Sequence, residues 1–238
     1  MCVSNRAVLL GSVLLLVSRL LIAAELRPFE ASFSVNWRGM NAGTSNLSLQ
    51  QRSADTWLYS SSSVPRGLFR AFLPDEITQR SELRIVGDDV QPLHYVADDG
   101  TNSKKRDLDL HFDWERQRVT GVAAEQAVDV PLEAGLQDDL SVQVALMAAL
   151  SAGRVPADFK TFNERGVREY QYRREGAEKL QTALGMIDTI IFSSSRPGSS
   201  RVTRYWCAPS LGYLPLRAQQ KRGEQIEWTM DIRRLQRD

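Results

Sequence analysis

The chain has 238 residues, a formal net charge of +1 and 25% charged residues. This near-neutral balance argues against nucleic-acid binding, which depends on many cationic contacts to phosphates. Two cysteines are too few for a disulfide-built scaffold, and the length is sufficient for a sizeable hydrophobic core.

The first 24 residues have the layout of a secretory signal peptide. Arg6 precedes an apolar run over residues 7–17, and residues 22–24 end the segment in small side chains before Glu25. Arg19 interrupts the apolar stretch well short of the about 20 residues that a spanning helix needs. We therefore expect cleavage between Ala24 and Glu25, export to the periplasm and no membrane span in the mature protein.

Cleavage also changes the charge and the cysteine content. It removes two arginines and no acid, so the formal net charge becomes −1 over 214 residues. Cys2 lies far from the cleavage point, so we expect no lipoprotein anchor. Cys207 then remains as a single thiol without an internal disulfide partner, and we interpret it as a small buried hydrophobe.

Period-two alternation dominates the chain from Phe29 onwards. Residues 29–37 alternate apolar and polar side chains, which is typical of an antiparallel strand with one buried face, and Gly39 and Gly43 bracket a hairpin turn. The segment 65–73, which contains Phe69 and Phe72, is predicted to form a short helix or a lid. Further strands are predicted from residue 47, from residue 57, and over residues 77–86, 107–114, 118–122, 127–132, 168–174, 179–183, 186–195, 202–207, 213–221 and 225–233.

One segment, residues 138–152, has helical character instead. Asp138 is suited to cap its first turn, and Gly153 and Pro156 are suited to end it. Apolar residues lie on most sides of this helix, which predicts that it is buried nearly all round. The fold class that we expect is mainly β, with one long curved antiparallel sheet, a barrel or half-barrel, packed around this helix in a single domain over residues 25–238.

The segment Trp206-Cys207-Ala208-Pro209-Ser210-Leu211-Gly212-Tyr213-Leu214-Pro215-Leu216-Arg217 resembles the closing signature of an uncharacterised bacterial envelope family, domain of unknown function 3108. Residues 91–95, 138–141 and 178–182 with Gly185 are similar to the same family. The resemblance covers about residues 29–235. It implies an exported, β-rich protein and supplies no catalytic residue.

No arrangement of residues predicts catalysis or a cofactor. The only histidines are His94 and His111, and no Gly-x-Ser-x-Gly nucleophile motif accompanies them. Adjacent acids such as Asp98/Asp99 and Asp138/Asp139 are expected to point to opposite faces of a strand or to lie at a helix cap, which favours a structural role.

A metal site is not predicted either. The strand over residues 107–114 carries Asp107, Asp109, His111 and Asp113 on one face, but alternate residues lie nearly 7 Å apart along a strand. We therefore interpret this face as a solvated one.

These observations favour a non-catalytic envelope protein that binds an apolar ligand, such as a lipid, or an envelope partner protein in its curved sheet. Two alternatives remain open, a hydrolase of envelope glycan or peptide and a purely structural scaffold with a filled core. A sizeable apolar cavity beside the helix favours ligand binding. The candidate contact residues are Trp206, Tyr213, Arg217, Leu140, Val144, Met147, Phe69 and Phe72.

Overall fold

The computed structural model describes residues 26–73, 75–87, 89–156 and 158–237. The expected leader and its cleavage point between Ala24 and Glu25 lie outside the described residues. In the described part of the chain, one α-helix, α1 (Ser141–Ser151), and two short 3₁₀ helices, η1 (Gly67–Ala71) and η2 (Pro209–Leu211), accompany fifteen strands. The strands are β1 (Phe29–Trp37), β2 (Met40–Gln51), β3 (Thr56–Pro65), β4 (Ile77–Val86), β5 (Asp89–Asp98), β6 (Leu108–Asp113), β7 (Arg118–Ala123), β8 (Gln126–Pro131), β9 (Gln137–Asp138), β10 (Asp158–Asn163), β11 (Gly166–Thr182), β12 (Gly185–Ser195), β13 (Arg201–Ala208), β14 (Leu214–Arg222) and β15 (Gln225–Arg237).

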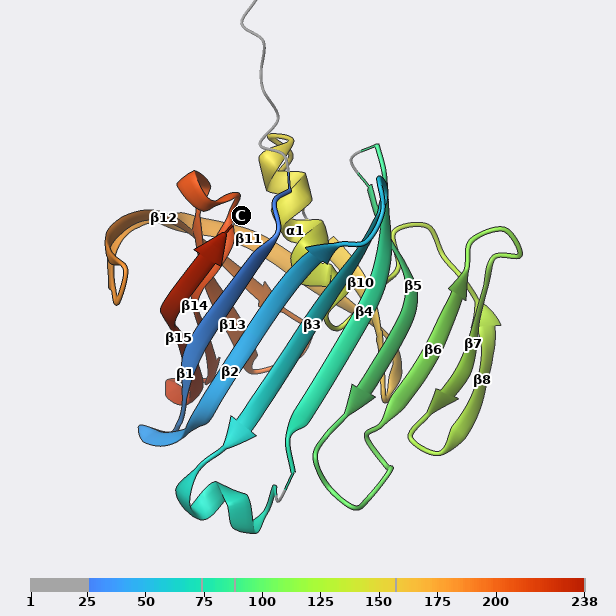
Figure 1. Ribbon diagram of the computed structural model, residues 1–238, viewed down its shortest axis with the longest axis horizontal. Helices are drawn as coiled ribbons and strands as arrows, with labels where there is room; N and C mark the ends of the chain where they lie inside the picture. The colour runs from blue at the N-terminus through green and yellow to red at the C-terminus, as the bar shows by residue number, and fades with distance from the viewer. Residues whose placement is uncertain (1–25, 74, 88, 157, 238) are drawn as a thin grey trace, which may run out of the picture.

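All these strands form one curved sheet that is not closed. Its order is β8-β7-β6-β5-β4-β3-β2-β1-β15-β14-β13-β12-β11-β10-β9, so the chain begins in the middle, runs to one edge, and returns from the other edge to pair β15 with β1. Neighbouring strands are antiparallel, except that β9 and β10 are parallel over two residue pairs. Figure 1 shows α1 within the concave side of the sheet. The predicted mainly β fold, a half-barrel around one buried helix, is confirmed.

The alternation of apolar and polar residues produces the two faces of the sheet. In β6, Leu108, Leu110 and Phe112 are buried, and Asp109 and His111 between them are exposed. The same alternation holds in β1, where Phe29, Ala31 and Phe33 are buried. The inward side chains of both halves of the sheet join residues of α1 in one continuous hydrophobic core.

The helix is buried on most sides, as predicted. Val144, Leu146 and Met147 have at most 2% of their surface exposed. The helix begins at Ser141 and not at the predicted residue 138, which lies in β9. Asp138 nevertheless accepts the expected hydrogen bonds at the start of the helix, because its Oδ1 accepts from the backbone N–H groups of Leu140 (2.8 Å) and Ser141 (2.6 Å).

Some predicted boundaries were wrong. The two strands predicted over residues 168–174 and 179–183 are one seventeen-residue strand, β11, with an irregularity between Arg174 and Gly176. Strands β9 and β10 were not predicted, because two residues are too few for a periodic pattern and residues 158–163 show no clear alternation. The segment predicted as a short helix or lid is η1, which projects from the turn between β3 and β4 (Figure 1).

Candidate functional site

The sheet fails to close where β9 lies against β4 and β5, and we call this region the seam. Side-chain hydrogen bonds join its two sides: Ser81 Oγ donates to Asp138 Oδ2 (2.6 Å), and Gln137 Nε2 donates to the carbonyl of Val90 (2.8 Å). Ser81, Gln137 and Asp138 are all buried. The seam is therefore held by buried hydrogen bonds, one between two side chains and one from a side chain to a backbone carbonyl, and not by a ladder of main-chain hydrogen bonds.

A cleft of about 580 Å³ opens along the seam, and we call it the seam cleft. Its apolar walls include Val90, Trp114 and Phe159, and two small helix residues, Ala145 and Ala149, form part of its surface on α1. Charged residues also line it, namely Asp89, Arg154, Asp158, Lys160 and Glu169. The volume is in the range of ligand pockets, and the mixed lining suits a ligand with an apolar body and a polar end.

A second hollow, of about 450 Å³, lies near the opposite ends of β5 and β6, and we call it the polar hollow. A smaller hollow of about 190 Å³ shares Glu164, Arg165 and Arg201 with it. The polar hollow is lined by Trp37, Ile77, Gln79, Tyr95, Ala97, Asp98, Asp99, Arg106, Leu108, Asp139, Glu164, Arg165 and Arg201.

Asp139 is the most perturbed acid in the polar hollow. Its side chain keeps surface exposed toward the hollow, but the surrounding protein encloses it. This burial, with the neighbouring charges of Asp138 and Glu164, raises the pKa of Asp139 to about 7. At neutral pH this carboxyl group therefore exchanges its proton easily.

Tyr95 adds an unpaired polar group to the same wall. Its side chain is fully buried, and its hydroxyl has no hydrogen-bond partner within the described residues. Burial raises the pKa of Tyr95, and the charges of Asp139, Asp138 and Glu164 add to this effect, so the phenol stays neutral. A buried hydroxyl without a partner is a group that a water molecule or a ligand can satisfy.

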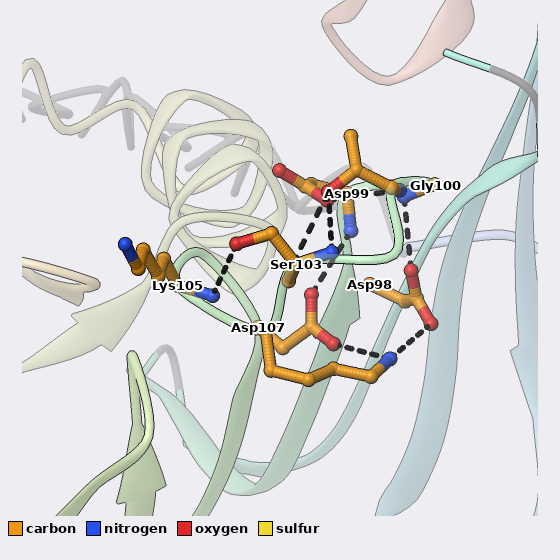
Figure 2. A network of polar contacts seen from close by, with 8 residues as sticks. Asp98, Asp99, Gly100, Ser103, Lys105 and Asp107 are labelled. Atoms are coloured by element: carbon orange, nitrogen blue, oxygen red, sulfur yellow. Dashed lines mark hydrogen bonds and ion pairs between the residues drawn. The ribbon is translucent and has the colours of Figure 1, made fainter.

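The acids Asp98 and Asp99 also border the polar hollow, but they serve the turn between β5 and β6 (Figure 2). Asp98 Oδ1 accepts a hydrogen bond from the backbone of Gly100 (2.9 Å), which lowers the pKa of Asp98. Lys104 Nζ lies 3.4 Å from Asp98 Oδ2 and 2.7 Å from Asp107 Oδ2. The ammonium group therefore offsets part of the negative charge of this acidic cluster, and these acids serve the structure of the turn.

The structure places the predicted contact residues away from both hollows. Leu140, Val144 and Met147 belong to the core between helix and sheet, which is packed by side chains. Trp206 is 8% exposed and donates from Nε1 to Glu178 Oε1 (2.6 Å), and the Arg217 guanidinium lies 5.7 Å from the centre of its ring.

The three remaining predicted residues are spread over two places. Tyr213 is half-buried against a second, smaller hydrophobic cluster. In η1, Phe69 is half-buried, whereas Phe72 is 78% exposed. These residues do not converge on one site.

Sequence reasoning missed the residues of the seam cleft. Phe159 lies in the unpredicted strand β10, and Trp114 was assigned only to a strand face. One signal was present, since Ala145 and Ala149 are four residues apart and lie on the same face of a helix, where small side chains leave a groove.

Cys207 is fully buried, as predicted. This burial raises the pKa of its thiol to about 12, so the thiol stays protonated and is not a nucleophile at neutral pH.

Together these features define a β-barrel-like protein with an open seam, an internal helix, and two larger hollows, the seam cleft and the polar hollow. The chain belongs to the family of proteins of unknown function DUF3108, whose model matches residues 32–225. The resemblance carried by the segment from Trp206 to Arg217 is thus confirmed. Among curated proteins, none matches the chain.

Several solved structures are similar to this chain. A β-barrel-like protein of domain of unknown function DUF1849 from Brucella abortus is similar with a TM-score of 0.59 and 8% identity, over 90% of this chain and 98% of that one. At that identity the similarity establishes the fold alone. The MucA/MucB complex of Pseudomonas aeruginosa has a chain similar at 14% identity (TM-score 0.39, 92% of this chain and 54% of that one), and a YmcC-like protein from Bacteroides fragilis is similar at 9% (TM-score 0.39, 89% and 97%).

No helix in the described part of the chain is long and apolar enough to cross a membrane.

Proposed function

We propose that this chain is an exported, non-catalytic binding protein of the bacterial envelope, which holds an amphipathic ligand, such as a lipid, in the seam cleft. The observation that carries the proposal is the cleft itself, about 580 Å³ with an apolar wall of Val90, Trp114 and Phe159 and a set of charged residues around it. The leader pattern of residues 1–24 supports export.

Because the core is packed, we place the proposed binding site in the seam cleft and not between the helix and the sheet. Residues of α1 fill the concave side of the sheet, so an apolar ligand has no room between helix and sheet at the positions first expected, Leu140, Val144 and Met147. The seam cleft instead offers apolar surface that is already open to solvent. Its charged side chains suit a polar head group, whereas its walls suit an acyl chain or an apolar side chain of a partner protein.

Native mass spectrometry of protein purified from cells tests the proposal, together with binding of the hydrophobic dye 1-anilinonaphthalene-8-sulfonate. We expect a co-purified ligand or saturable dye binding by the unaltered protein. The substitution Ala149→Leu places a larger side chain in the cleft and is expected to abolish that binding. Ala152→Leu, just beyond the end of the same helix and outside the cleft lining, is the matched control and is expected to bind normally.

Two results contradict the proposal. One is the absence of both a co-purified ligand and dye binding in the unaltered protein. The other is binding that Ala149→Leu leaves unchanged.

Hydrolysis of an envelope polymer is the second candidate function, and the pair Asp139 and Glu164 favours it. Both acids line the polar hollow, and the pKa of Asp139, raised to about 7, suits a general acid at neutral pH. Glycoside hydrolysis requires such a carboxyl group and a second, ionised carboxylate across the substrate. For this candidate we expect the protein to release soluble fragments from purified peptidoglycan, and we expect Asp139→Asn and Glu164→Gln each to abolish the release. Absence of release by the unaltered protein at every pH from 5 to 8 contradicts this candidate.

A further inference from the structure

The only two histidines of the chain lie side by side on the convex face of the sheet. His94 in β5 and His111 in β6 are directly opposite in the register of these strands. Their rings are stacked, with centroids 4.2 Å apart and planes inclined by 6°. The next pair in the register, Tyr95 and Leu110, is fully buried, so the two imidazoles point to the outer side of the sheet.

A carboxylate completes the group. Asp109 lies two residues before His111 in β6 and so shares its face. Its Oδ1 lies 2.8 Å from His94 Nε2 and 3.8 Å from His111 Nε2. One oxygen is therefore within reach of both rings, and the ligating atoms of the three residues lie within 4.8 Å of one another.

These separations are close to those of a bound ion. Zinc with nitrogen and oxygen ligands at about 2.1 Å in tetrahedral geometry keeps its donor atoms roughly 3.3 Å apart. The side chains of Asp109 and His111 are each 60% exposed, and that of His94 is 32% exposed. The two rings are nearly parallel, so both side chains must rotate to direct a nitrogen lone pair at one ion, and their exposure to solvent permits this rotation.

The types of ligand atom in this group favour one class of metal ion over another. Two imidazoles and one carboxylate suit zinc and copper, whereas calcium takes six to eight oxygen ligands. On the neighbouring strand β4, Glu82 is opposite His94 in the register, so a further carboxylate, or water, is available for the fourth position.

We propose that His94, Asp109 and His111 form a surface site for a divalent first-row transition ion, represented by Zn²⁺. The ion joins β5 to β6, which pair over only four residue pairs, compared with nine between β4 and β5. It thereby fixes the β6–β8 edge of the sheet to the rest of the molecule. This role is independent of the ligand in the seam cleft.

Isothermal titration calorimetry with ZnCl₂ tests the site, using metal-free protein purified without a histidine tag. We expect one Zn²⁺ bound per chain, a melting temperature that rises with Zn²⁺ concentration because the ion binds the folded state, and no binding of Ca²⁺ at the same concentrations. Absence of Zn²⁺ binding, or equal binding of Ca²⁺, overturns the proposal.

Variants assign the binding to these residues. His94→Ala and His111→Ala are each expected to weaken Zn²⁺ binding by about tenfold or more, because loss of even an outer-shell partner costs about 10–100-fold. Asp109→Asn is expected to weaken it in the same direction. Asp129→Asn removes an exposed carboxylate from β8, outside the group, and is the matched control that retains binding. Circular dichroism checks that each variant is folded, and Zn²⁺ binding that survives both histidine substitutions overturns the assignment.

Discussion

Two regions of this molecule bring together segments that are distant in sequence, and they do so by different means. Where β1 meets β15, the first and last strands pair over nine residue pairs, and Phe33 and Ile232 are opposite each other with almost no exposed surface. At the seam, β9 meets β4 and β5 through the side chains of Ser81, Gln137 and Asp138. The seam cleft opens at the second region, so a hollow forms where main-chain pairing ends.

The largest effect is expected at the β1–β15 junction. Ile232→Ala removes buried apolar volume from a residue that is 2% exposed, which is expected to lower the free energy of unfolding by about 3 kcal/mol. Urea denaturation measures this change. Ile226→Ala, in the same strand at a residue that is 40% exposed, is the matched control with an expected change within about 0.5 kcal/mol. Equal effects of the two substitutions contradict the view that the junction is a packed core.

At the seam, Asp138→Ala is expected to cost about 2 kcal/mol. The substitution removes the acceptor for two backbone N–H groups of α1 and for Ser81 Oγ, and it leaves these buried donors without a partner. Urea denaturation measures the loss, and amide hydrogen exchange is expected to be fastest in the first turn of α1. The neighbouring variant Asp139→Ala removes no cap hydrogen bond and serves as the control. Uniformly faster exchange throughout the sheet contradicts a local opening of the seam.

Asp139, next to the cap residue of the seam, is expected to make the stability of the protein depend on pH. The pKa of Asp139 is about 7 in the folded protein and 3.8 in the reference state, so the folded state binds more protons than the unfolded state between about pH 4 and pH 7. Stability contributed by the protonated form is therefore present at low pH and is lost as the pH rises to about 7. Asp139→Asn is expected to flatten this slope, measured as the melting temperature over pH 4–8. Part of the slope is expected to remain, because burial also raises the pKa of Asp138. A slope that Asp139→Asn leaves unchanged contradicts this assignment.

The smallest effect is expected at Cys207, which packs in one cluster with Leu146 and Leu150 of α1. Its protonated, buried thiol is expected to react with 5,5′-dithiobis(2-nitrobenzoic acid) only in guanidinium chloride. In Asp138→Ala the reaction of the native protein is expected to become detectable, because a loosened helix exposes this cluster. Rapid labelling of the unaltered protein under native conditions is the contrary outcome.

Much of the fold was predictable from local pattern. The alternation over residues 77–86 predicted the bounds of β4. The apolar residues on most sides of the segment 138–152 predicted a buried helix there, with Asp138 accepting hydrogen bonds at its start. Strands β9 and β10 were not predictable in this way. The parallel pairing of Gln137 and Asp138 with β10 joins segments that lie before and after α1, and no sequence period reports such a contact.

The sites were less predictable than the fold, because each of them combines segments distant in sequence. Asp109 and His111 were judged too far apart along one strand to share an ion, and His94 was not considered with them. The register of β5 and β6 places the two histidine rings 4.2 Å apart. The seam cleft combines residues of β5, α1, β10 and β11 with Trp114, which follows β6, and the polar hollow combines Tyr95 with Asp139 and Glu164.

The sequence by itself determined which side chains point inward, that one segment forms a buried helix, and that Cys207 is a buried thiol. These features follow from local periodicity, capping chemistry and residue type. Only the tertiary structure decided which strands become neighbours, where the sheet stays open and which polar groups meet. The physical reason is that a period of two assigns a residue to a face of the sheet, whereas its partner on the next strand is set by long-range packing.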